Sequence, residues 1–273
     1  MALRINYNLA SSSAQRGLGA SQDAYAKQAT RLSTGLRINS ASDDAAGMAV
    51  SEKLKNQVRG LNQAQRNAQD GVSLLQTAEG GLAETHNILA RMRELAVQAS
   101  NDTLATADRT NINAEFTQLQ AEITRIATST KFNGISLLDN TTGVTLQIGA
   151  NNGNTLAVAT TDNQATTLLV DAGAIDVTSR TQAVAAITAI DTAVNTVSTN
   201  RANMGATQSR LESVGRSLAV ASENTAAANS RVADADIASS MSELVRAQIL
   251  QQAGISVLAQ ANQAPALVLQ LLK

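Results

Sequence analysis

Apolar residues recur at every seventh position over a long, proline-free stretch in the first half of the chain. The repeat runs through Leu54, Leu61, Ala68, Leu75, Leu82, Leu89 and Ala96. This period places the residues on one face of a helix, and a sustained seven-residue repeat requires a second helix against that face. At about 1.5 Å per residue, the stretch forms a helix of about 60 Å. The pattern predicts a rod-like helical protein.

A second seven-residue repeat lies in the other half of the chain and matches the first in length. It runs through Ile190, Val197, Met204, Leu211, Leu218, Thr225 and Val232. A shorter stripe with spacings of three and four lies between the two, at Ile112, Phe116, Leu119, Ile123 and Ile126. We expect the two long helices to lie antiparallel, with the shorter helix as a third member of the bundle.

The period changes near residue 143, where strand and turn signals replace the helical stripe. Val144, Leu146 and Ile148 alternate with polar residues, and Leu156 and Val158 repeat the alternation after a polar turn. This alternation predicts a β-hairpin, which we expect to lie at the far end of the rod. The fold class predicted is mainly α: a long antiparallel helical bundle or coiled coil with a small β-hairpin excursion.

The two ends of the chain carry thinner apolar stripes, which we expect to drive self-association. The positions concerned are Ile5, Leu9, Leu18, Leu32, Ile237, Met241, Leu244, Ile255, Leu258 and Leu269. A pair of helices without a third layer buries little apolar area against its ordering entropy. We therefore expect the ends to be disordered in the monomer and helical in a polymer.

These patterns divide the chain into three parts. We expect residues 1–42 and 234–273 to form a terminal helical domain, and residues 43–140 and 179–233 to form a helical rod domain. Residues 141–178 form the β-hairpin and a loop that belong to the rod domain. Ser42 or Asp43 is expected to cap the first rod helix, with acidic charge near its N-terminus.

Composition narrows the possible functions. Aromatic residues make up 1% of the chain and apolar residues 44%, so small aliphatic side chains must fill the core. A net charge of −1 without a basic stripe gives little basis for binding nucleic acid, and no apolar run is long enough to span a membrane. Cysteine is absent, and His86 is the only histidine. We expect a solvated His86, no metal site, no cofactor and no enzymatic activity.

Several longer stretches resemble the bacterial flagellins. The matching stretches are Met1–Asn6, Gln15–Arg16, Arg31–Gly47, Arg93–Gln98, Phe132–Gly134, Gly205–Glu212, Ala233–Asp236, Gln248–Gly254 and Leu258–Asn262. They occur in family order and cover roughly residues 1–140 and 180–273. Only a short segment lies between residues 143 and 178, where larger flagellins carry outer domains. The chain therefore resembles a short form without large outer domains.

The resemblance implies a structural subunit that polymerises into the flagellar filament for motility. The chain ends would form an inner helical layer, and the longer helices would form the next layer out. The subunit would be extracellular and exported without a cleaved signal peptide. The partners implied are further copies of the chain, the flagellar export apparatus, an export chaperone, the filament cap and the hook-junction proteins.

The resemblance also implies a contact surface at Arg91, Leu95 and Glu115. Pattern alone favours a charged outer face of two paired helices. In the family, this surface packs between neighbouring protofilaments and is recognised by the host Toll-like receptor for flagellin. Two alternatives remain open: a hook–filament junction protein, expected to lack the full matches between residues 31 and 98, and a signalling coiled coil that dimerises without forming filaments.

Overall fold

The structure, a computed structural model, describes the backbone of residues 8–271 and the side chains of residues 8–263. Its elements in chain order are α1 (Leu9–Thr34), α2 (Ala45–Ala99), α3 (Thr106–Ser129), β1 (Lys131–Phe132), β2 (Ile135–Ser136), β3 (Val144–Gln147), β4 (Thr155–Val158), α4 (Arg180–Ala233) and α5 (Ile237–Leu271). The predicted mainly helical fold with a small β excursion is confirmed.

The chain forms two compact units: one comprises residues 57–223, and the other combines the described residues up to 56 with those from 224 onward. The helix breaks lie elsewhere, at residues 35–44 and 234–236. The division into domains at residues 42 and 234 therefore stays a prediction based on the sequence pattern.

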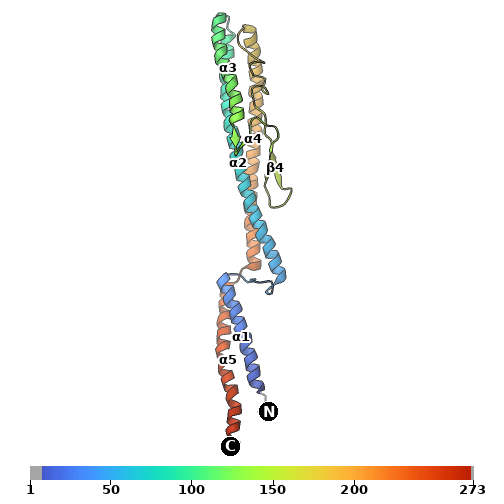
Figure 1. The fold of residues 1–273 in the computed structure, drawn as a ribbon, viewed down its shortest axis with the longest axis vertical. Coiled ribbons are helices and arrows are strands. Elements are labelled where there is room, and N and C mark those ends of the chain that lie inside the picture. Colours follow the sequence, from blue (N-terminus) through green and yellow to red (C-terminus); the bar gives the residue numbers. More distant parts are fainter. Residues whose placement is uncertain (1–7, 272–273) are drawn as a thin grey trace. The chain divides into compact units, whose positions relative to one another are not determined.

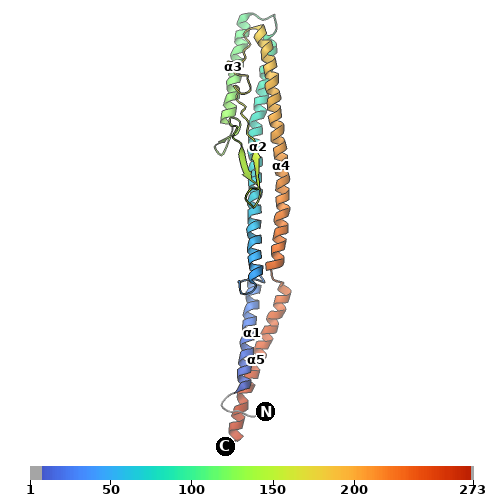
Figure 2. The ribbon, with the colours of Figure 1, turned by 90° about the vertical axis from the view of Figure 1, so that its right-hand side faces the viewer.

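Helices α2, α3 and α4 lie side by side in the unit of residues 57–223 (Figures 1 and 2). The side chains of both seven-residue repeats are buried here, including Leu82 and Leu89 from α2 and Ile190 and Val197 from α4. The ring of Phe116 from α3 completes this core. Contacts such as Arg93 with Asp191 join the start of α4 to the end of α2, which confirms the antiparallel pairing.

Two antiparallel β-hairpins lie between α3 and α4 in the chain. In the first, Asn133 and Gly134 form the turn with φ values of 48° and 81°, the conformation that an Asn-Gly pair tolerates. In the second, β3 pairs with β4 from Val144 opposite Val158 to Gln147 opposite Thr155. The second hairpin confirms the one predicted from the alternation between residues 144 and 158.

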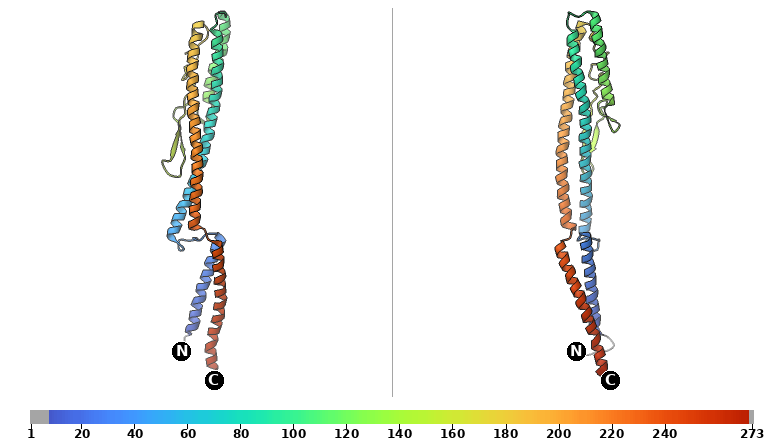
Figure 3. Two further views of the ribbon diagram at one scale, coloured as in Figure 1. Left: turned by 180° about the vertical axis from the view of Figure 1, so that it is seen from behind. Right: turned by 90° about the vertical axis from the view of Figure 1, so that its left-hand side faces the viewer.

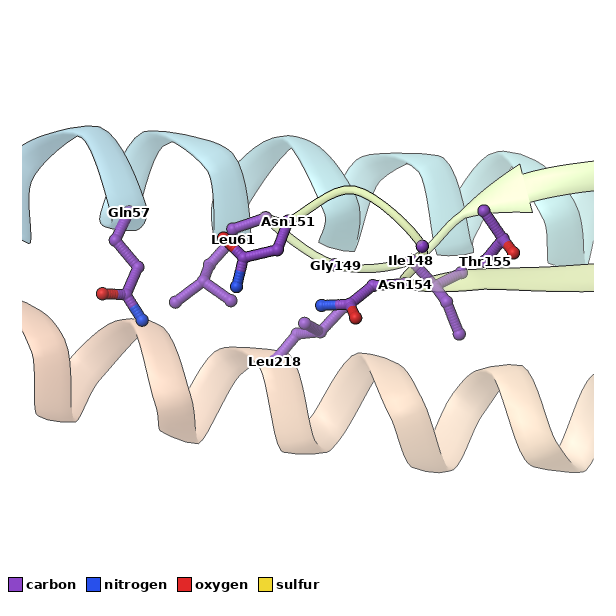
Figure 4. A pocket seen from close by; sticks show the side chains of 10 residues that line it. Gln57, Leu61, Ile148, Gly149, Asn151, Asn154, Thr155 and Leu218 are labelled. Carbon is purple, nitrogen blue, oxygen red and sulfur yellow. The ribbon is translucent and has the colours of Figure 1, made fainter.

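The position of the second hairpin differs from the expectation. It runs along the middle of α2, where Asn67 Nδ2 donates a hydrogen bond to the carbonyl oxygen of Gln147 at 2.9 Å. Figure 4 shows its turn lying against Leu61 from α2 and Leu218 from α4. This close approach requires Gly60, where a Cβ would lie 2.9 Å from the Cβ of Ala150. The expectation of a hairpin at the far end of the rod was therefore wrong.

Residues 159–178 return the chain to α4 without regular structure. The fully buried Asn163 anchors them. Its backbone N–H donates to the Leu138 carbonyl at 2.7 Å, and its side-chain Oδ1 accepts from Asn200 Nδ2 at 2.8 Å. Each of these groups has a partner, as buried polar groups require. One side chain thus links this segment to α4.

In the other unit, α1 and α5 lie side by side and run antiparallel (Figures 1 and 3). Asn8 Nδ2 donates to the Ala261 carbonyl at 2.8 Å. The connecting segments meet where Leu36 pairs with Asp234. The cap of α2 is Asp44, whose Oδ1 accepts from the Gly47 N–H at 2.8 Å. The expectation that Ser42 or Asp43 would cap this helix was wrong, because Asp43 accepts from the Asn39 and Ser40 N–H groups instead.

Candidate interaction surfaces

A charged surface lies where α2 and α3 pack together. Arg91 Nε on α2 donates to Glu115 Oε1 on α3 at 2.9 Å, and Arg91 Nη1 donates to Glu94 Oε2 at 3.0 Å. The side chains of Arg91 and Glu115 are 49% and 47% exposed. The hydrogen bond that Arg91 donates to Glu94, followed by the one it donates to Glu115, raises the pKa of Arg91. The arrangement presents one guanidinium between two carboxylates.

Leu95 does not share this surface. Its side chain is 2% exposed and belongs to the hydrophobic core. It lies one helical turn beyond Arg91, on the face of α2 that packs inward. The structure therefore brings Arg91 and Glu115 together at the surface, and Leu95 is unavailable for direct contact in this packed unit.

A second ionic contact joins α2 and α4. Arg93 Nε donates to Asp191 Oδ1 at 2.7 Å, and this hydrogen bond raises the pKa of Arg93. Sequence reasoning missed this pairing because the two residues are far apart in the chain. Exposed ion pairs of this kind contribute little to stability, so the surface is more informative about partners than about the fold.

The apolar positions of the chain ends remain largely open to solvent. Ile237, Met241 and Ile255 are exposed on α5, whereas Leu244 and Leu258 are half-buried. On α1, Leu9 is exposed, Leu18 and Leu32 are half-buried, and no residue is buried. Ile5 and the side chain of Leu269 lie outside the described residues. The structure adds four exposed apolar residues of α5 to the expected set: Val245, Ile249, Leu250 and Val257.

The unit of residues 57–223 also carries two shallow grooves. One, of about 410 Å³, lies beneath the turn of the second hairpin (Figure 4). The other, of about 450 Å³, lies between α2 and α4 and includes Ala68, Val72 and Leu211. Neither groove contains a nucleophile paired with a base. Sequence reasoning could not locate these grooves, because each forms from elements distant in the chain.

The described residues hold neither a cluster of metal ligands nor a membrane-spanning helix. Within the described part of the chain, no three His, Cys, Asp or Glu side chains gather as metal ligands. No helix in that same part is apolar and long enough to cross a membrane. His86 is half-buried and its Nδ1 lacks a hydrogen-bond partner in the structure. The expectation of a solvated His86 was therefore only partly correct.

Comparison with known proteins identifies the family. Residues 5–143 match the family model of the bacterial flagellin N-terminal helical region, and residues 187–272 match that of the C-terminal helical region. A flagellin from Halalkalibacterium halodurans is 50% identical, with 98% of this chain and 99% of the relative covered. A flagellin from Bacillus subtilis is 42% identical, with 99% and 100% covered. A flagellar filament core protein from Treponema phagedenis is 42% identical, with 98% and 99% covered.

Solved structures agree in fold. The crystal structure of Bacillus cereus flagellin is 36% identical with a TM-score of 0.51, covering 56% of this chain and 88% of that chain. A putative flagellar hook-associated protein from Vibrio parahaemolyticus has a TM-score of 0.60 at 16% identity, covering 70% of this chain and 100% of that chain, and shares the fold alone. Flagellins are structural proteins and not enzymes. The chain belongs to the bacterial flagellin family, and it is a structural subunit of the extracellular flagellar filament.

Proposed function

We propose that this subunit builds a filament for motility by open, head-to-tail polymerisation, and that its two ends become ordered only on assembly. The supporting observation is the absence of any buried residue on α1 together with the row of exposed apolar residues on α5. Such a helix pair gains little from its own packing against the entropy of ordering. Packing against further copies of the chain would bury the exposed apolar side chains of α1 and α5.

Hydrogen exchange tests this proposal directly. Backbone amides of α1 and α5 should exchange rapidly in the monomer and slowly in the filament, because only assembly buries these helices. Amides of α2 near Leu82 serve as the internal control, since they are protected by the core in both states. Strong protection of the α1 and α5 amides in the monomer would refute the proposal.

We also propose that the exposed surface around Arg91 and Glu115 is recognised by the host Toll-like receptor for flagellin. Both side chains are accessible, and their paired charges give the surface a defined geometry. Leu95 of the same helix lies in the hydrophobic core of the unit, so its role is to support the surface from beneath. The surface serves equally for contacts between protofilaments, since the receptor meets the monomer and the filament buries it.

Charge reversal at Arg91 tests whether receptor signalling depends on this surface or only on the overall charge of the helices. Arg91→Glu in the soluble monomer should reduce receptor signalling. Arg125→Glu is the matched control, because Arg125 is an exposed α3 arginine that pairs with Glu122 on its own helix. Unchanged signalling by Arg91→Glu, or an equal loss with both variants, would remove the proposal.

The exposed apolar residues of α5 favour a partner that covers this helix before assembly. We propose that an export chaperone covers residues 234–273 before export, and that the flagellar export apparatus passes the subunit to the hook-junction and cap proteins. The chain is proposed to be exported without a cleaved signal peptide. Mass spectrometry of secreted subunits tests this: peptides from residues 2–30 support it, and their loss contradicts it.

Two alternatives are less well supported. The hook–filament junction protein would be expected to lack the matches from residue 31 to 98, whereas the flagellin N-terminal match covers this whole stretch. A signalling coiled coil would form discrete dimers, whereas a filament subunit adds to filament fragments and grows long filaments.

A further inference from the structure

Leu169 occupies an unfavourable backbone conformation at the surface. Its φ is 57°, a left-handed value that a residue with a Cβ seldom adopts. The Leu169 N–H donates to the Thr166 carbonyl at 3.2 Å, and the Val170 N–H donates to the Ala165 carbonyl at 2.9 Å. These bonds close a turn of the kind that usually has glycine at the left-handed position.

The side chain of Leu169 packs little against its own subunit. It is 66% exposed, while its neighbours Leu168 and Val170 are buried. Among the exposed large apolar residues of the unit 57–223, it is the most exposed, ahead of Val220 and Val184. A glycine would relieve the backbone strain and remove the exposed apolar surface, so contacts within the folded subunit do not explain this leucine.

The groove between α2 and α4 is a hollow that no side chain of its own subunit fills. The half-buried Val72 and the exposed Ala219 contribute accessible apolar side chains to it, and the buried Ala68 and Leu211 form its base. Glu212 and Arg216 contribute charged side chains. Gly215 also lines the groove, although a Cβ at this position would meet no atom within 4 Å. Glycine is disfavoured in a helix interior relative to alanine, so packing within the subunit does not account for Gly215 either.

We propose that Leu169 of one subunit inserts into the Gly215 groove of a neighbouring copy. An open polymer requires two different, complementary surfaces on each subunit, and Leu169 and the groove lie on different elements of the same unit. A groove with apolar side chains beside charged ones matches the anatomy of protein interfaces. Its volume of about 450 Å³ accommodates a leucine side chain. The proposal rests on the chain being a filament subunit.

The absence of cysteine from the chain permits an unambiguous cross-linking test. Thr166→Cys places a thiol on the exposed turn and preserves Leu169, and Ala219→Cys places one in the groove. The two variants are mixed in equal amounts, polymerised and treated with a short bis-maleimide. Ala185→Cys replaces Ala219→Cys in the control, because Ala185 is another exposed alanine of α4 that does not line the groove.

Filaments of the Thr166→Cys and Ala219→Cys mixture should yield covalent dimers, and each variant polymerised alone should yield few. Filaments of the mixture that yield no more dimers than the Ala185→Cys control would overturn the proposal. Failure of the unsubstituted chain to form filaments would instead refute the filament function on which the proposal rests. The two failures are therefore distinguishable.

Assembly energetics give a second, independent measurement. Leu169→Gly should raise the critical concentration for filament growth by roughly tenfold or more, because the leucine is buried only on assembly. Its monomer should melt at the same or a higher temperature. Growth of Leu169→Gly at the unsubstituted critical concentration would contradict the proposal.

Discussion

The carboxylate of Asp43 connects α1 with the turn before α2. Its Oδ1 lies 2.8 Å from Lys27 Nζ, and its Oδ2 accepts from the N–H groups of Asn39 and Ser40. The hydrogen bond from Lys27, with those from the two backbone amides, lowers the pKa of Asp43 from 3.8 to about 2. One side chain therefore connects two helices in a charge-dependent way.

This lowered pKa predicts a stability change in acid. The folded form holds the proton less tightly than the unfolded form, so the stabilisation is fully present above about pH 4. It is lost as pH falls from there towards 2, where the folded carboxylate also becomes protonated. The Asp43→Asn variant should lack this component of the acid dependence. Because Lys27 belongs to α1, the shift requires an ordered α1, and carboxyl-carbon NMR titration of assembled filaments therefore measures it. A pKa near 3.8 in the filament would contradict the interpretation.

The neighbouring Asp44 has the separate role of capping α2. Asp44→Ala should lower the free energy of unfolding by about 1 kcal/mol, because the Gly47 N–H loses its acceptor. Asp44→Asn is the control, since an asparagine side chain also caps helices and should retain most of the stability. Thermal unfolding of both variants measures the difference. Equal losses would indicate that charge, rather than capping, is responsible.

The sequence predicted acidic residues at the start of this helix but assigned the cap to the wrong one. The choice between Asp43 and Asp44 depends on Lys27, which lies on the preceding helix and draws Asp43 away from the helix start. Leu95 shows the same limitation. Its place in the core depends on which face of α2 meets α3 and α4, and spacing from Arg91 alone did not separate the two.

At the scale of elements, the seven-residue repeats predicted the helices well because the period itself requires a helix and a partner. The residues of the first repeat from Leu61 to Ala96 are buried. Those of the second repeat from Ile190 to Leu218 are buried as well. The place of the second hairpin was not predictable in this way. It depends on contacts between α2 and residues about 80 positions later, such as Asn67 with Gln147, and local patterns carry no signal for them.

The contact at Gly60 gives a test of hairpin docking. In Gly60→Ala the new Cβ would lie 2.9 Å from the Ala150 Cβ and 3.3 Å from its Cα, so the hairpin turn must move. We expect lower stability, despite a gain of up to about 1 kcal/mol in helix propensity. Gly80→Ala in the same helix is the matched control, because its Cβ meets nothing within 4 Å.

Chemical denaturation compares the two alanine variants. Gly80→Ala should raise the free energy of unfolding by up to about 1 kcal/mol, and Gly60→Ala should lower it. The denaturant dependence should remain unchanged if both variants unfold as the parent does. A stabilised Gly60→Ala would show that the hairpin does not dock against α2 as described.

At the scale of the whole molecule, burial is distributed unevenly along the chain. Among the described residues, the buried apolar side chains outside residues 57–223 are Ile38, Ala233 and Ala247. The unit of residues 57–223 therefore has a core sufficient to hold it together. The ends instead carry exposed apolar side chains, as the sequence pattern predicted from their thin stripes. For this reason, self-association of the ends could be predicted from the sequence. The groove at Gly215 could not, because it forms only where α2 and α4 pack together.

Seeded assembly followed by electron microscopy tests the central claim, that the chain polymerises through its ends into an open filament. Purified monomer is added to short filament fragments, beside a version that ends at Val232 and therefore lacks α5. The full chain should grow long filaments and the truncated chain none, while circular dichroism confirms that the truncated chain retains helix. Discrete dimers from both chains would contradict the filament account and favour a signalling coiled coil.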